Sequence, residues 1–280
     1  MYDTTRDSDG GEWRSSLVSQ QMSWATETKD NTGADCVIGT DDRCGKSVFP
    51  RKAIIATTAT GVHIFDGSDN TLWMSFTQAG TYALGADTNN NPSGVGAQNG
   101  VIVVGTNGAS ATGMYAFDFK QDQMYRYNVT NRVQGDVNIG NRNSTVTYAT
   151  DANTNMALID TVVNDVSVAM ITSSTEGTPN TLTLPTDSVA GPVRGMTLIA
   201  AATDTGISVV NMASRKTLSY SDATGNDYNQ VVITSRARLY ATNEALAQME
   251  EWRNIDRDVA AEVNGTPDRV YDETVGKSPI

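Results

Sequence analysis

The sequence predicts an all-β protein of β-propeller-like repeats of antiparallel strands, with a loop-rich N-terminal segment and a short C-terminal helix and tail. Three observations predict this class. A unit made of an apolar run, a polar turn and an alternating strand recurs near residues 53, 100 and 195. Phe65-Asp66 and Phe117-Asp118 lie 52 residues apart, a period typical of propeller blades. The 24 Gly and only 7 Pro favour strands and tight turns over helices.

The chain divides by its pattern into three parts: an N-terminal arm at residues 1–50, a propeller-like domain at 51–255 and a C-terminal tail at 256–280. The first part is polar and rich in turn residues, with Trp13, Met22 and Trp24 as isolated anchors. We therefore expect an extended or loop-rich arm that precedes the repeats.

The first two repeats have the clearest pattern. The first runs from Ala53 to Phe76, and its Asp, Gly and Asn at 66–70 predict a hairpin turn, because these residues tolerate positive φ. The second has strands at 100–104, 114–118 and 124–127. We expect loops between repeats at 85–98 and 138–155, where Asn, Gly, Ser and Thr dominate.

Three later repeats complete the body. A degenerate unit covers 162–171 and 182–184, another begins at Gly195, and the last covers 230–242. The 93 residues from Phe117 to Val210 fit two further steps of the period, which gives about five units. Residues 243–252 have a helical pattern, and the charged, aperiodic residues that follow predict a tail that becomes ordered on a partner.

Charge and hydropathy exclude some partners. Twenty basic and 32 acidic residues give a net charge of −12, which argues against specific nucleic-acid binding. Two thirds of this charge lies in residues 1–50 and 250–280. No apolar run approaches the roughly 20 residues of a membrane span, and the first residues lack an apolar signal core, so we expect a soluble chain without a secretory leader. Cys36 and Cys44 form either a disulfide or two free thiols, and the second is favoured.

Few residues carry a chemical signal. His63, the single histidine, lies in an alternating strand and has no partners for a triad or metal site, so we interpret it as structural. Asp66, Asp118, Asp165 and Asp204 recur near turns; they either cap these turns or converge as an acid/base pair, and capping is favoured. The segment 7–12 only loosely resembles a calcium loop, and a solvated turn is favoured.

The aromatic residues have two interpretations. They form either a sugar-stacking surface or half-buried packing on strands, and packing is favoured; they are Trp73, Tyr82, Tyr115, Tyr125, Tyr127 and Tyr148. No Gly-rich phosphate loop leads from a strand into a helix. The sequence thus predicts no catalytic, cofactor-binding or metal-binding residues and no cofactor.

The N-terminal motif Tyr2-Asp-Thr-Thr-Arg-Asp-Ser-Asp-Gly-Gly-Glu-Trp-Arg14 is the most distinctive part of the chain. Together with Ser23-Trp24, Phe49-Pro50 and the strands at 53–56 and 62–67, it resembles a family of virion structural proteins of tailed bacteriophages. The match is good over roughly residues 1 to 80, is weaker through the repeats, and returns at 163–165 and 206–210. Glu12 stands where relatives have a small residue, and 36–46 looks like an inserted loop.

This resemblance implies a virion tail component, a nozzle or distal tail ring, that assembles as a homo-oligomer around the DNA channel. Adaptor and fibre proteins of the tail would be its neighbours. No catalytic residues carry over, since the family motif is structural. The acidic ends or loops would face the channel and repel DNA. Two alternatives remain: a tail protein that binds host-surface glycans, and a glycoside hydrolase or lyase that uses paired carboxylates.

Overall fold

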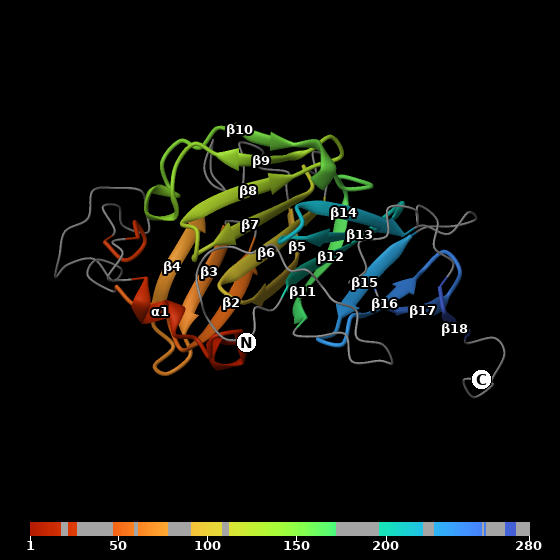
Figure 1. Ribbon diagram of the computed structural model, residues 1–280, viewed down its shortest axis with the longest axis horizontal. Coiled ribbons are helices and arrows are strands. Elements are labelled where there is room, and N and C mark those ends of the chain that lie inside the picture. The colour runs from red at the N-terminus through yellow and green to blue at the C-terminus, as the bar shows by residue number, and fades with distance from the viewer. Residues whose placement is uncertain are drawn as a thin grey trace.

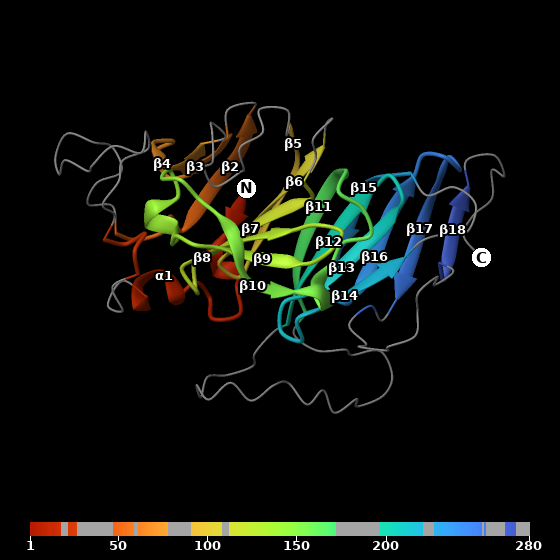
Figure 2. The ribbon, with the colours of Figure 1, turned by 90° about the horizontal axis from the view of Figure 1, so that it is seen from above.

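The computed structural model describes residues 1–17, 22–26, 47–58, 61–77, 91–107, 112–171, 196–220, 227–253, 255 and 267–272. These residues form four antiparallel sheets that follow one another in chain order, which confirms the all-β, propeller-like class. Figures 1 and 2 show the sheets in succession across the molecule, with the first and the fourth at opposite ends in both views. The described strands therefore form an open row.

The first sheet has the strand order β1-β2-β3-β4. Its strands are β1 (Tyr2–Asp3), β2 (Lys52–Thr58), β3 (Gly61–Asp66) and β4 (Leu72–Thr77). Tyr2 lies opposite Ala53, so the start of the chain is the edge strand of the first repeat. The predicted hairpin turn between β3 and β4 is confirmed: Asn70 has a φ of 59°, and Asp66 accepts hydrogen bonds from the Ser68 backbone and hydroxyl.

The second sheet has six strands, in the order β10-β9-β8-β7-β6-β5. They are β5 (Asn91–Gln98), β6 (Val101–Asn107), β7 (Met114–Asp118), β8 (Gln123–Tyr127), β9 (Arg132–Gly135) and β10 (Tyr148–Asn153). The loop predictions at 85–98 and 138–155 were wrong for β5 and β10. Gly and Pro obscure β5 in the sequence, yet a Cβ at Gly96 would lie 2.9 Å from the Val168 side chain, so glycine permits close packing on the next sheet.

The third sheet corrects the number of repeats. Its strands are β11 (Val163–Ile171), β12 (Met196–Thr203), β13 (Gly206–Asn211) and β14 (Lys216–Tyr220). Because β11 pairs with β12, the units predicted at 162 and 195 belong to one sheet, and the described residues form four repeats instead of five. The 93 residues from Phe117 to Val210 therefore correspond to one step of the repeat, from the second sheet to the third, and not to two. This step is long because it includes β9, β10 and the segment between β11 and β12. The strand expected at 182–184 lies outside the described residues.

The fourth sheet contains β15 (Tyr228–Ile233), β16 (Arg238–Asn243), β17 (Gln248–Arg253) and β18 (Arg269–Asp272). The helix predicted at 243–252 was wrong. Residues 244–247 form a turn in which Ala247 has a φ of 51°, and β17 follows. Helix-favouring residues here adopt a strand because Trp252 lies opposite Leu239 in the core, so tertiary packing overrides local propensity. β18 shows that four residues of the predicted tail are a strand paired with β17.

Short helices and a buried core complete the fold. The helices are η1 (Thr4–Arg6), α1 (Trp13–Ser16), η3 (Ile139–Asn141) and η4 (Thr154–Met156). No helix in the described ranges is both long and apolar enough for a membrane span. One core cluster joins the first two sheets to the N-terminal segment, and Trp24 and Phe49 are fully buried in it. The third and fourth sheets share a second cluster, which contains Trp252.

Side chains of β11 attach the third sheet to the edge strand of the fourth. The backbone N–H of Val231 donates to Asp165 Oδ2 at 3.1 Å, and the N–H of Ile233 donates to Ser167 Oγ at 3.1 Å. These bonds satisfy edge N–H groups that have no neighbouring strand in this sheet. The β15 edge of the fourth sheet is thereby held against β11, and the face of this sheet that is not packed in the core carries the pocket described below.

Candidate functional site

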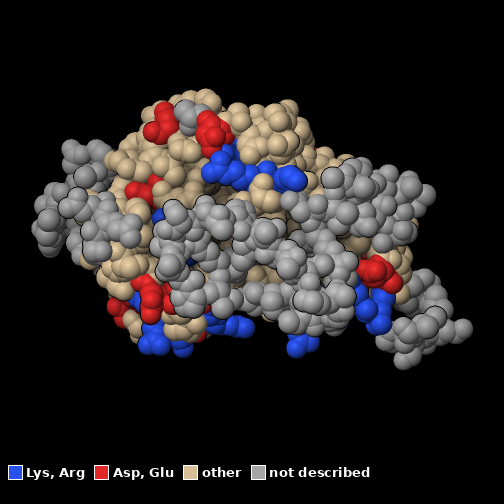
Figure 3. All heavy atoms as spheres, in the orientation of Figure 1, with Lys and Arg blue, Asp and Glu red and all other residues tan. Residues whose placement is uncertain are grey.

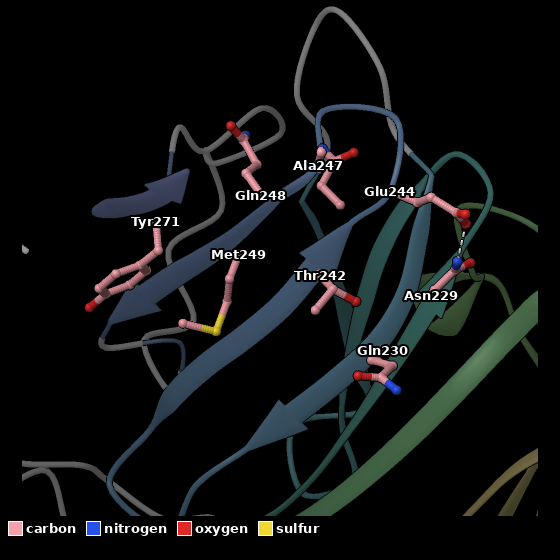
Figure 4. Close-up of a pocket in the computed structure, with 9 residues that line it drawn as sticks. Asn229, Gln230, Thr242, Glu244, Ala247, Gln248, Met249 and Tyr271 are labelled. Atoms are coloured by element: carbon pink, nitrogen blue, oxygen red, sulfur yellow. Dashed lines mark hydrogen bonds between the residues drawn. The ribbon is translucent and has the colours of Figure 1, made fainter. Parts of the chain in front are cut away.

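An open pocket of about 640 Å³ lies on the fourth sheet, between the ends of β15 to β18 (Figure 4). Its volume falls within the range of roughly 300–1,000 Å³ that is common for small-molecule sites. Amide, hydroxyl, thioether, phenol and carboxylate groups line it: Asn229, Gln230, Thr242, Asn243, Glu244, Ala247, Gln248, Met249 and Tyr271.

The floor of the pocket is a single row of side chains that crosses all four strands. Gln230 lies directly opposite Thr242, Thr242 opposite Met249, and Met249 opposite Tyr271. Directly opposed residues of an antiparallel sheet project from the same face, so one residue from each strand contributes. Met249 is 37% exposed, and Gln230 is also exposed. The row therefore faces solvent.

A buried carboxylate holds one end of this sheet in place. Glu250 is fully buried and accepts hydrogen bonds from Tyr228 Oη at 2.8 Å, Asn243 Nδ2 at 3.1 Å and Gln248 Nε2 at 2.6 Å. At the rim, the Asn229 amide donates to Glu244, a contact drawn in Figure 4. Most polar groups around the row are thus already oriented by neighbours.

A second carboxylate network lies beside the row on the same face. Glu251 is 1% exposed and accepts hydrogen bonds from Arg253 Nε at 2.9 Å and from Tyr271 Oη at 3.0 Å. Burial acts to raise the pKa of Glu251, but the bonds from Arg253 and Tyr271 outweigh it and hold that pKa below its usual range. The bond to Glu251 fixes the orientation of the Tyr271 ring at the edge of the pocket.

Three residues of the N-terminal motif, Tyr2, Asp7 and Trp13, form a different kind of site, one that is buried. Asp7 Oδ2 accepts hydrogen bonds from Tyr2 Oη at 2.5 Å and Trp13 Nε1 at 2.9 Å. Its other oxygen accepts from the Asn99 backbone at 2.7 Å and from Gln98 Nε2 at 3.0 Å. Burial raises the pKa of Asp7 against these bonds. The motif therefore ties the start of the chain to the turn between β5 and β6.

The four recurring aspartates do not form one site. Asp66 and Asp118 cap their turns, which confirms the capping interpretation for both; Asp118 accepts from the N–H groups of Lys120 and Gln121. Burial raises the pKa of Asp118 to about 6, although these N–H groups lower it. Asp165 instead bonds the Val231 N–H, and Asp204 accepts from the Asn164 amide.

Other predicted residues have structural environments. His63 Nδ1 lies 2.9 Å from Ser75 Oγ, and burial lowers the pKa of His63. The carboxylate of Asp9 accepts from the backbone of Gly11 and Trp13, which places it in a turn. Four of the proposed stacking aromatics are buried: Trp73, Tyr115, Tyr125 and Tyr127. Tyr82, Cys36 and Cys44 lie outside the described residues.

The pocket residues were missed by sequence reasoning. Gln248 and Met249 fell in the predicted helix and Tyr271 in the predicted tail. The alternation gives no usable signal here, because the apolar Met249 is exposed and the charged Glu250 beside it is buried, the reverse of the usual strand pattern. Figure 3 shows acidic and basic side chains side by side at several places on one face, so that face has no single acidic field among its described residues.

The described residues thus define an all-β protein of propeller-like sheets. No protein-family model matches the sequence, and no curated protein matches it. Solved structures resemble the chain at low identity. A protein of unknown function from Bacteroides caccae has a TM-score of 0.35 and 8% identity, over 79% of this chain and 57% of that one.

Two further solved structures contain repeats of the propeller type. The WD40 repeats of RRP9 give a TM-score of 0.36 and 7% identity, over 72% of this chain and 56% of that one. The Swd1 β-propeller domain from Myceliophteria thermophila gives 0.35 and 9%, over 81% and 70%. The chain spans little more than half the length of the first of these structures and of RRP9. The propeller-like class rests on the sheet topology, and these similarities say nothing of function.

Proposed function

We propose that this chain is a non-enzymatic structural component of a phage tail, a nozzle or distal tail ring that assembles as a homo-oligomer around the DNA channel. One observation carries the proposal. The residues by which the N-terminal motif resembles virion proteins, Tyr2, Asp7 and Trp13, make a single buried hydrogen-bonded network. A motif used in this way has an architectural role, as the resemblance implies.

The packing around that network supports the same proposal. Trp13 contacts Trp24 and Phe49, and the ring centroids of Trp13 and Phe49 are 5.2 Å apart. Trp24 and Phe49 each contact Phe119 in the turn after β7 of the second sheet, with the ring centroids of Phe49 and Phe119 4.9 Å apart. Such aromatic contacts make a rigid joint between the first two sheets. Rigid sheets suit a subunit that must hold its shape within a tail, next to adaptor and fibre proteins.

The net charge of −12 suits a protein that lines a DNA channel without binding the DNA. Like charge would repel the phosphate backbone as the genome passes through the channel. We therefore expect the purified chain to show no DNA binding at physiological salt. Retention of duplex DNA on the protein in a filter-binding assay would contradict this part of the proposal.

The decisive experiment examines assembly and location together. The purified chain is studied by light scattering after size exclusion and by negative-stain electron microscopy, and particles of a phage that encodes it are labelled with antibodies to the chain. We expect ring-shaped oligomers and label at the tail. A chain that stays monomeric at every concentration and is absent from the particles would overturn the proposal.

A further inference from the structure

We propose that the pocket on the outer face of the fourth sheet binds a neutral saccharide unit. Gln230 and Thr242 would form the hydrogen bonds, and Met249 and Tyr271 the apolar contacts. This proposal does not rest on the role in a phage tail, because it uses only the shape and chemistry of the pocket.

Two polar side chains on the pocket floor are available to a ligand. Within the described part of the chain, neither the Gln230 amide nor the Thr242 hydroxyl has a hydrogen-bond partner. By contrast, Asn229, Asn243, Gln248 and Tyr271 bond to carboxylates. Amides and hydroxyls both donate and accept, which matches ligand hydroxyl groups that do the same. The two free groups lie opposite each other on adjacent strands.

The charges of the lining residues favour a neutral ligand. The described residues that line the pocket include no Lys, Arg or His, so a phosphate or carboxylate would find no cation there. The one lining carboxylate, Glu244, is at the rim and is already bonded to Asn229. A neutral ligand is therefore favoured over an anion.

The pocket also offers an apolar surface beside its polar pair. Met249 lies between Thr242 and Tyr271 in the row and is 37% exposed, and the Tyr271 ring is held by its bond to Glu251. A saccharide ring presents C–H groups on its faces and hydroxyls at its edge. A pocket with a polar pair at one side and a thioether and a ring at the other fits that distribution.

The test uses neutral trisaccharides composed of glucose, galactose, rhamnose and N-acetylglucosamine as probes, each added at millimolar concentration to isotope-labelled full-length chain. We expect at least one probe to shift the NMR signals of the Gln230 side-chain amide and the Met249 methyl group. The variants Gln230→Ala and Thr242→Val should each weaken that binding about tenfold, as measured by titration.

The matched control is Thr147→Val, the same substitution at an exposed threonine beside the second sheet. It should leave the affinity unchanged, and the backbone spectra of all three variants report whether the sheets remain folded. The proposal is overturned if no probe binds, if binding is unaffected by both pocket variants, or if the shifts cluster on another surface. An acidic trisaccharide is added as a further probe, and its binding next to Arg238 and Arg253 without binding of any neutral probe would also overturn the proposal. None of these outcomes depends on whether the chain forms a ring.

Discussion

Trp13 donates its indole N–H to the carboxylate of Asp7 across 2.9 Å, and both side chains are buried. The same carboxylate oxygen also accepts from the Tyr2 hydroxyl. One acidic side chain therefore fixes the edge strand β1 and the helix α1 at once, and its other oxygen reaches the second sheet through the Asn99 backbone. The N-terminal motif thus holds β1 and α1 of the first repeat against the second sheet.

Replacement of Asp7 by Ala should destabilise the protein by about 3 kcal/mol, because it leaves several buried donors without an acceptor. The free energy of unfolding is measured by urea titration at pH 7. Glu12→Ala is the matched control: Glu12 is exposed in the same motif and its loss should change stability by less than about 0.5 kcal/mol. Equal effects of the two variants would show that the network contributes little.

Asp118 should make stability depend on pH in the acidic range. Its folded-state pKa of about 6 lies above the ordinary value of 3.8, so between these values the folded state holds a proton that the unfolded state releases. The contribution of this group to stability therefore falls as pH rises from about 4 to 6. Asp118→Asn keeps an acceptor for the N–H groups of Lys120 and Gln121 and removes the titration.

Accordingly, the variant Asp118→Asn should gain stability relative to the natural chain by about 2 kcal/mol on going from pH 4 to pH 7. Urea titrations of both proteins at the two pH values measure this difference. A difference that stays constant with pH would mean that the Asp118 carboxyl does not titrate abnormally in the fold.

Glu251 should affect the pH dependence of stability in the opposite direction to Asp118. Its pKa is depressed in the fold, so it stabilises the protein above its ordinary pKa, and the contribution is lost as pH falls through the lowered value. We expect Glu251→Gln to cost about 1 kcal/mol at pH 7 and less at pH 3. Glu244→Gln at the exposed rim is the control, with an expected change below about 0.5 kcal/mol. Thermal unfolding followed by circular dichroism measures these costs. A larger cost for Glu244→Gln than for Glu251→Gln at pH 7, or a larger cost for Glu251→Gln at pH 3 than at pH 7, would contradict the prediction.

Gly113 should tolerate no side chain. Its φ is 102°, and a Cβ there would overlap the carbonyl oxygen of Tyr127 on the neighbouring strand. Gly10 also has positive φ, 65°, but a Cβ there meets nothing within 4 Å. We expect Gly113→Ala to cost about 3 kcal/mol or more, and Gly10→Ala only about 1 kcal/mol from backbone strain. The free energy of unfolding of both variants is measured by urea titration. Similar losses in the two variants would show that a small backbone shift removes the overlap at Gly113.

The local sequence pattern predicted strands and turns correctly where apolar and polar residues alternate along a strand and where a turn has its characteristic residues. The strands of the first repeat and the capped turns at Asp66 and Asp118 were predicted for this reason. Prediction failed where the stabilising contacts are remote in sequence. β5 is a strand because it pairs with β6 and its glycines accommodate β11, and neither partner is visible in the segment itself.

The same contrast applies to the candidate site. None of its four floor residues has a distinctive sequence context, and Met249 lies in a segment whose composition favours a helix. Their alignment depends on the register of three strand pairs, which brings residues 230, 242, 249 and 271 into one row. Register is set by burial of the opposite face, where Leu239 and Trp252 pack, and burial is a property of the whole fold.

The sequence by itself determined that this protein is built of repeated antiparallel strands, since alternation and turn chemistry act within a few residues. Tertiary structure alone decided that the units predicted at 162 and 195 form one sheet, that 248–253 is a strand, and that Tyr2, Asp7 and Trp13 of the N-terminal motif are buried. The physical reason is that pairing and burial join residues up to about a hundred positions apart, as in the hydrogen bond from the Gly100 backbone to Tyr2.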